Sequence, residues 1–355
     1  MKKVLLVSNR VMHYRSKIYN QFYDLFKDKN IDFHVVSNDY QDVDFPIRYV
    51  QHIIPFILKE YIQLIRELNP DVCIFFLHLK DKIFIPLLIW CKIKKIPVIY
   101  WGHGINLESP NSKFKRVIFN YIHWLSDAII LYSSKQIKYI HTKSQEKIFI
   151  APNTLAFDNN ERFGISKTEE VKKMYGIKEN MVVLYISRIL PYKGLDVLLE
   201  QFRDTPQIAL VIVGPGINSE QQKIVDETSN YYYLGEKYGK DVDEIFNIGD
   251  VFSTPGHIGL ALVQAMYWSI PVVLLNRRHA PEIVYLHNGE NGFVVDTPKE
   301  LKQIILRLNH DRSLYEKVSR KARDTYEKEM QIAIMFKGFM DAVCFVLRKK
   351  RRTIE

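Results

Sequence analysis

One strand–loop–helix segment constrains the fold of this chain more than any other stretch. Residues 181–186 form an uninterrupted apolar run, which predicts a buried strand. Residues 195–202 carry apolar side chains at helical spacing. The loop between the two contains Arg188 and Lys193. In an open parallel sheet such a loop lies at the carboxyl ends of the strands, which is where ligands bind.

Arg188 and Lys193 are suited to a phosphate or a diphosphate. They precede a predicted helix whose free N–H groups and dipole also favour an anion. Gly194 follows them and lets the chain turn into the helix. The alternative is a pair of solvated cations on a surface loop. The spacing alone does not decide between these two interpretations.

Predicted strands and helices alternate along the whole chain, which indicates doubly wound α/β architecture. A chain of 355 residues that is 47% hydrophobic suits two domains of roughly 150 to 180 residues. Polar residues without periodicity mark the boundary. We predict a first domain over residues 1–153, a linker over 154–168 and a second domain over 169–330. A last helix with a basic tail, 331–355, is expected to pack back on the first domain.

Composition limits the partners and the compartment. The net charge of +10 favours an anionic partner, either nucleic acid or a membrane surface. No helix-turn-helix, zinc-finger or RNA-binding signature accompanies this charge, so we favour an anionic membrane surface and a polyanionic small ligand, with no nucleic acid. Three scattered cysteines and no signal-peptide pattern suit a cytoplasmic protein, peripheral on the inner face of the plasma membrane.

The central loop also carries a specific motif. The run Ser187-Arg-x-x-x-Tyr-Lys-Gly-x-Asp-x-Leu-Leu resembles the diphosphate-binding segment of the retaining nucleotide-sugar glycosyltransferases of family 4. Residues 211–216 and 270–295 resemble further segments of that family. The resemblance implies the GT-B fold, in which two Rossmann-like domains face each other across a cleft. It also implies that Arg188 and Lys193 hold the donor's diphosphate during catalysis.

The loop over residues 254–260 departs from the family pattern. The family carries Glu-Gly-Phe-Gly-Leu-x-x-x-Glu-Ala-Met here, and its two carboxylates fall on Gly256 and Gln264 in this chain. Gln264 keeps an uncharged acceptor, whereas Gly256 has no side chain to offer. We interpret this as a branch of the family, with the donor sugar left open. The expected donor-binding residues are Gly214, Gly256, His257, Ile258, Gly259, Leu260, Gln264 and Glu282.

The first domain offers acceptor-side candidates. His103 lies between two glycines after a predicted strand, and the resemblance implies that it lies near the transferred sugar. Arg10, His13 and Arg15 follow the first strand, where arginines would hold an anionic acceptor such as a lipid diphosphate. The alternative is a merely basic loop. The basic, aromatic helix over 113–125 suits either a membrane interface or packing on the sheet.

The resemblance implies a hexosyltransferase that moves a sugar with retention. The donor is a UDP- or GDP-linked sugar and the acceptor a saccharide or lipid-linked glycan, in bacterial surface polysaccharide or lipopolysaccharide synthesis. Because Arg188 and Lys193 would neutralise the diphosphate leaving group, we expect no metal and no cofactor beyond the donor. The alternatives are a catalytically inactive sugar-nucleotide or polyanion-binding protein and a sugar-nucleotide 2-epimerase. A nucleic-acid binder is the weakest of them.

Overall fold

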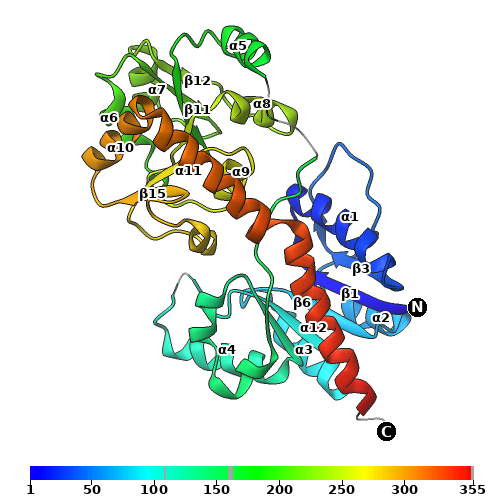
Figure 1. The fold of residues 1–355 in the computed structure, drawn as a ribbon. Coiled ribbons are helices and arrows are strands. Elements are labelled where there is room, and N and C mark those ends of the chain that lie inside the picture. The colour runs from blue at the N-terminus through cyan, green and yellow to red at the C-terminus, as the bar shows by residue number, and fades with distance from the viewer. Residues whose placement is uncertain (108, 159–161, 163, 353–355) are drawn as a thin grey trace. The chain divides into compact units, whose positions relative to one another are not determined.

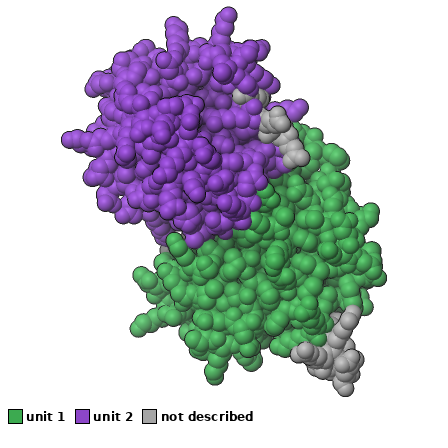
Figure 2. Space-filling model, in the orientation of Figure 1, with its two compact units in different colours: residues 1–156, 331–355 green, residues 157–330 purple. Residues whose placement is uncertain are grey.

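The chain folds into two compact units, each described by itself below (Figure 2). The computed structural model describes residues 1–107, 109–158, 162 and 164–352. Unit 1 comprises residues 1–156 and 331–355, and unit 2 comprises residues 157–330. The boundary between 156 and 157 falls inside the predicted linker. Positions 159–161 and 163 of that linker, and 353–355 of the predicted tail, lie outside the described residues.

Unit 1 is built on a seven-stranded parallel sheet in the order β5-β3-β1-β6-β7-β8-β9. Its central strands are continuous apolar runs because helices cover both faces. The reversal of strand order puts β1 between β3 and β6, which makes the carboxyl end of β1 a topological switch point. The strands are β1 (Lys2–Ser8), β3 (Ile31–Ser37), β5 (Val50–Ile53), β6 (Val72–Phe76), β7 (Val98–Gly102), β8 (Ala128–Leu131) and β9 (Ile148–Ile150).

Helices form the outer layers of unit 1 (Figure 1). One face of the sheet packs against α1 and α12, and the other against α2, α3 and α4. The helices are α1 (His13–Lys27), α2 (Leu58–Leu68), α3 (Phe84–Ile93), α4 (Lys113–Leu125) and α12 (Ile332–Arg352). Two 3-10 helices, η1 (Ser134–Tyr139) and η2 (Thr142–Lys147), and a small two-stranded sheet of β2 (Arg10–Val11) and β4 (Asp39–Tyr40) complete the unit.

The last helix, α12, belongs to the core of unit 1. Its Phe336 and Phe339 rings lie 5.4 and 4.9 Å from that of Phe22 on α1, centroid to centroid. The helical stretch over residues 312–349 contains an 18-residue window of mean hydropathy 1.7, long and apolar enough to cross a membrane, and half of that window is buried inside the protein. Met335 and Val343 are fully buried. The apolarity of α12 therefore follows from its packing on the sheet.

Unit 2 contains a six-stranded parallel sheet in the order β12-β11-β10-β13-β14-β15. Here β10 lies between β11 and β13, so the loop after β10 occupies the switch point. The strands are β10 (Met181–Ile186), β11 (Ile208–Val213), β12 (Tyr231–Tyr233), β13 (Val251–Phe252), β14 (Val272–Leu275) and β15 (Gly292–Val295).

The helices of unit 2 cover both faces of this sheet. They are α5 (Ile165–Met174), α6 (Leu195–Phe202), α7 (Ser219–Asp226), α8 (Lys240–Ile248), α9 (Ala261–Tyr267), α10 (Pro298–His310) and α11 (Arg312–Thr325), with the short turns η3 (Pro191–Lys193) and η4 (Pro281–Tyr285) and the π-helical η5 (Tyr326–Met330). The predicted α/β class with parallel sheets is confirmed. Glu282 lies at the second position of the short 3-10 helix η4.

Candidate functional site

Glycines lock together three loops at the carboxyl edge of unit 2. Gly214, after β11, has φ of +129°, and a Cβ there would lie 2.1 Å from Ser187 O in the loop after β10. A Cβ on Gly256, after β13, would lie 1.9 Å from Tyr192 O in the same loop. Neither position tolerates a side chain without backbone movement. The loop after β10 is therefore clamped from both sides.

Hydrogen bonds complete this clamp. The N–H groups of Gly256 and His257 donate to Lys193 O and Tyr192 O at 2.9 and 3.0 Å. The Lys193 ammonium donates in return to His257 O at 2.7 Å. On the other side, Ile189 N–H donates to Pro215 O at 2.8 Å. The Lys193 side chain is thus held between the loops after β10 and β13.

Arg188 and Lys193 place uncompensated positive charge at the switch point. Arg188 is exposed and Lys193 is half-buried. Burial, and then the Arg188 guanidinium, lower the pKa of Lys193. Within the described part of the chain, neither side chain forms an ion pair with a carboxylate. Two adjacent cations without a counterion favour a dianionic ligand such as a diphosphate.

The remaining predicted donor residues surround this loop. Ile258 is buried, whereas Gly259, Leu260 and Gln264 are half-buried. Glu282 is buried at 5% exposure in η4. Burial, followed by Lys193, lowers the pKa of His257, so its ring is neutral near pH 7.

His279 holds this part of the edge in place, and the sequence interpretation missed it. Its Nδ1 accepts from Ile258 N–H at 3.3 Å, and its Nε2 donates to Leu275 O at 2.9 Å. It thereby ties the loop after β13 to the end of β14. The sequence contains no signal for this role beyond the position of His279 shortly after a predicted strand.

At the carboxyl edge of unit 1, His103 has a fixed tautomer. The Gln136 Oε1 accepts from the backbone N–H groups of Tyr132 and Ser133 at 2.9 and 3.1 Å, which orients the amide. Its Nε2 group therefore donates to His103 Nδ1, 3.0 Å away. Burial lowers the pKa of His103 to about 4, with smaller effects from His78 and Arg15. A neutral imidazole whose Nδ1 accepts must carry its proton on Nε2.

The three predicted acceptor-side residues lie in different surroundings. Arg10 is exposed and pairs with Asp39, with Nε 2.8 Å from the carboxylate. His13 is exposed at the start of α1, and its Nδ1 donates to Gln41 Oε1 at 3.1 Å. Both side chains are engaged within unit 1. Whether either meets an acceptor stays a prediction.

Arg15 departs most from the expected basic loop, because it lies in the first turn of α1 and is buried. Its guanidinium carbon lies 4.7 Å from the Trp101 ring centroid and 5.3 Å from that of Phe76. The Nε and Nη1 atoms are buried and have no hydrogen-bond partner among the residues that the structure describes. Such a guanidinium is stabilised by the aromatic faces instead. Its charge still reaches His103, whose pKa it lowers.

A second polar cluster at this edge was not predicted. Asp81, 7% exposed, accepts from the Asn9 side-chain amide at 2.8 Å and from His78 N–H at 2.6 Å. The carboxylate thereby joins the loops that follow β1 and β6. Both loops follow predicted strands, and that position was the signal available in the sequence.

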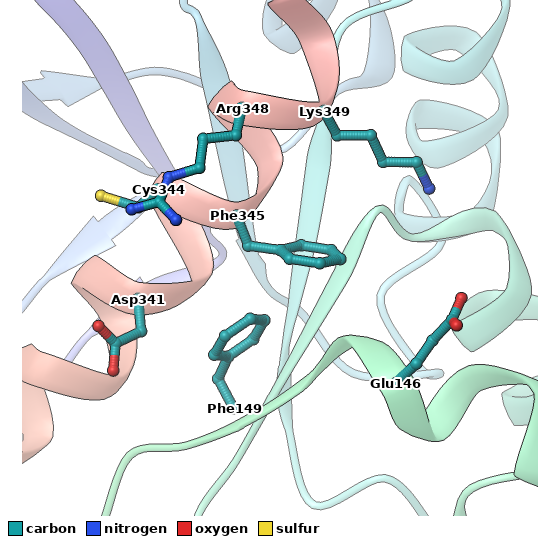
Figure 3. A pocket seen from close by; sticks show the side chains of 7 residues that line it. All are labelled: Glu146, Phe149, Asp341, Cys344, Phe345, Arg348 and Lys349. Atoms are coloured by element: carbon teal, nitrogen blue, oxygen red, sulfur yellow. The ribbon is translucent and has the colours of Figure 1, made fainter. Parts of the chain in front are cut away.

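A groove of about 580 Å³ in unit 1 is lined by residues other than those described at the carboxyl edge of that unit. Its lining comes from the end of α12 and from η2 and β9: Glu146, Phe149, Asp341, Cys344, Phe345, Arg348 and Lys349 (Figure 3). The Phe149 and Phe345 rings are 5.5 Å apart. None of the predicted site residues lines it. Its size therefore does not identify it as the site.

Comparison with known proteins establishes the class of protein to which this chain belongs. The structure superposes on the crystal structure of HepE from Anabaena in complex with UDP, with a TM-score of 0.78 at 17% identity, over 97% of this chain and 100% of the other. That likeness shows the GT-B fold. Residues 166–325 match the family Glycosyl transferases group 1. The chain is a GT-B glycosyltransferase, and this segment of unit 2 is similar to the group 1 family.

Two proteins of related sequence indicate the kind of reaction more closely. The chain is 25% identical to the capsular polysaccharide biosynthesis glycosyltransferase CapM of Staphylococcus aureus, over 88% of this chain and 90% of CapM. It is 29% identical to the GDP-mannose-dependent alpha-(1-6)-phosphatidylinositol monomannoside mannosyltransferase of Mycolicibacterium smegmatis. That second alignment covers 36% of this chain and 37% of the mannosyltransferase.

Proposed function

We propose that the chain transfers a hexose, with retention, from a UDP- or GDP-linked donor to a glycan or lipid-linked acceptor of a surface polysaccharide. The observation that carries the donor assignment is the pair Arg188 and Lys193 at the switch point, neither of which pairs with a carboxylate of the described residues. The name of CapM supports a polysaccharide acceptor. The UDP complex of HepE and the GDP-mannose dependence of the mannosyltransferase support the two donor bases.

In this proposal the two cations stabilise the departing diphosphate. Negative charge grows on its β-phosphate as the sugar–oxygen bond breaks, and preorganised charges are most effective where charge develops. Binding of the diphosphate also relieves the repulsion that lowers the pKa of Lys193. We infer that these side chains supply the charge that a metal would otherwise provide, so transfer is expected to persist after treatment with a chelator.

Retention follows, in this proposal, from attack on the face that the diphosphate leaves. The acceptor oxygen bonds to the anomeric carbon as the bond to the β-phosphate oxygen breaks, and that phosphate oxygen takes the acceptor's proton. His103 is neutral, with its proton on Nε2, so we assign it a hydrogen bond to a sugar hydroxyl rather than proton abstraction.

The test is a thermal-shift panel of UDP, GDP, ADP and CMP with their sugars. A ligand at about 100 times its dissociation constant adds roughly 2.7 kcal/mol of stability. We expect UDP or GDP to stabilise the wild type and not Arg188→Ala/Lys193→Ala. The matched control is Arg203→Ala/Lys223→Ala, which removes the same charge from two exposed side chains beside Glu227 in the same unit.

Each result of the panel decides the donor assignment. If the double variant at the switch point responds like the control, the diphosphate does not bind between Arg188 and Lys193. If a nucleoside diphosphate binds and no acceptor extract supports transfer, the protein is a sugar-nucleotide binder. Gly256 in place of the family's carboxylate is the observation that favours that second candidate.

A further inference from the structure

The outer face of α4 is unusually apolar for a surface helix. Phe114, Val117, Tyr121 and Trp124 are 76%, 66%, 46% and 65% exposed. Their spacing of three, four and three residues puts them in one row along the helix. We call these four side chains the outer stripe. Single exposed apolar residues are common on proteins, whereas a continuous row marks an interaction surface.

The outer stripe is not the face that holds α4 on the sheet. A second apolar face, made by Phe119, Ile122 and Leu125, is buried in unit 1 at 7%, 0% and 6% exposure. One face of the helix therefore packs in the core of unit 1, and the other face stays exposed. Figure 1 shows α4 on the outside of unit 1. Folding of unit 1 alone does not account for the aromatic residues of the stripe.

Positive charge borders the outer stripe. Lys113, Lys115 and Arg116 lie in the first turn of α4, and that turn contains no acidic side chain. Cations at the N-terminal end oppose the helix dipole, so they cost stability unless an anion lies nearby. Residues 113–147 contain seven lysines and arginines and two acidic residues. The surface thus combines an apolar row with a basic border.

The neighbouring helix α3 also exposes apolar side chains. α3 packs against α4 and exposes Ile89 and Ile93, at 37% and 71%. At the other end of α4, the Lys147 ammonium donates to Trp124 O at 3.3 Å and to Ser126 O at 2.5 Å. Apolar side chains and ammonium groups therefore accompany α4 along its length.

We propose that the outer stripe of α4 docks unit 1 onto an anionic lipid bilayer. Aromatic and aliphatic side chains would enter the interface between headgroups and acyl chains, and the basic border would lie against anionic headgroups. The Tyr121 and Trp124 rings, 5.8 Å apart, are the amphipathic type that favours this depth. Charge complementarity selects a bilayer over a second copy of the chain, because two copies of this basic face would repel each other.

Vesicle binding of the full chain tests the proposal without any donor or acceptor, so it is independent of the proposed transfer reaction. We expect binding to vesicles that contain phosphatidylglycerol and much weaker binding to phosphatidylcholine alone. Replacing all four stripe residues with Gln should weaken binding at least tenfold. The matched control is Ile53→Gln/Ile165→Gln/Met174→Gln, which removes side chains that are 66%, 85% and 61% exposed elsewhere. It should bind like the wild type.

Trp124 supplies a second readout that unfolding cannot mimic. Of the other tryptophans, Trp101 and Trp268 are 0% and 3% exposed and Trp90 is partly buried. Vesicles should shift the emission of Trp124 to the blue, and brominated lipid should quench it. Trp124→Phe should keep the binding and lose most of that signal. The proposal is overturned if the stripe variant binds vesicles like the control, or if the wild type forms a dimer through the stripe and ignores vesicles.

Discussion

The loops at the carboxyl edges of the two units are held by different kinds of contact. In unit 2 the backbone makes the edge: Gly214 and Gly256 bring loops into direct contact, and Lys193 is held by a main-chain oxygen. In unit 1 side chains make it: Gln136 orients His103, and Asp81 joins two loops. A backbone-built edge requires particular residues at adjacent positions. A side-chain network requires only that distant residues meet in the folded protein.

This difference agrees with the roles that we propose, in which unit 2 binds the diphosphate of the donor and unit 1 offers residues to the acceptor. A diphosphate is the same in every nucleotide sugar, so a rigid loop with two fixed cations suits it. Acceptors differ in shape and charge, and a network of side chains adapts to them by substitution. The predictions below test the two edges and the buried interior of unit 1, from the largest expected effect to the smallest.

The largest effect is expected for a side chain inserted into the backbone-built edge. Gly214→Ala places a Cβ 2.1 Å from Ser187 O at φ of +129°, so we expect a loss of about 4 kcal/mol in stability or no folding of unit 2. Gly176→Ala is the control: its φ is +72°, with no atom within 4 Å of the added Cβ. It should cost about 1 kcal/mol. Chemical denaturation measures both, and equal losses would show that the loop contact is unimportant.

The next largest effect is expected on the stability of unit 1 at acid pH. His123 is fully buried in unit 1, and neither ring nitrogen has a hydrogen-bond partner in the described part of the chain. Burial lowers its pKa from 6.5 to about 3. The folded state therefore binds fewer protons than the unfolded state between these values. Its contribution to stability is complete above pH 6.5 and is lost as the pH falls toward 3.

At pH 4.5 the loss from His123 should be about 2 to 3 kcal/mol. Thermal unfolding at pH 7.5 and 4.5 measures it. His123→Leu, which fills the same apolar space, should lose less stability on acidification than the wild type. The exposed His310→Leu is the control and should behave like the wild type. If the two variants lose stability equally, burial of neutral His123 does not explain acid sensitivity.

The smallest effect is expected in the side-chain network itself. Gln136→Leu removes the donor to His103 Nδ1, so we expect transfer to slow by about ten- to a hundredfold with donor binding unchanged. In Gln136→Glu the carboxylate should accept a hydrogen bond from Nδ1–H, which moves the His103 proton from Nε2 to Nδ1. Imidazole ¹⁵N shifts report the tautomer directly. Unchanged shifts in both variants would remove the positioning role that we assign to Gln136.

The same contrast explains what the sequence could predict. The α/β class followed from the alternation of apolar runs, and the loop containing Arg188 and Lys193 followed from a contiguous motif. His279, Gln136 and Asp81 act through contacts that depend on which strands are neighbours, and no local pattern encodes that.

Arg15 and α4 show two further limits of prediction from the sequence. The sequence placed Arg15 on a basic loop, but Trp101 and Phe76 from two other strands enclose it. For residues 113–125 we weighed a membrane interface against packing on the sheet. The structure shows one apolar face of α4 packed on the sheet and a second apolar face exposed, and the membrane is what we propose for the second.

The central claim is that Arg188 and Lys193 bind the β-phosphate of the donor. Calorimetric titration of UDP, UMP, GDP and GMP into the wild type and Arg188→Ala/Lys193→Ala tests it most directly. Charge-assisted hydrogen bonds contribute about 1.5 to 3 kcal/mol each, so the preferred diphosphate should bind at least about tenfold more tightly than its monophosphate. The account predicts that this advantage disappears in the double variant. A double variant that keeps the full advantage of the diphosphate would contradict it.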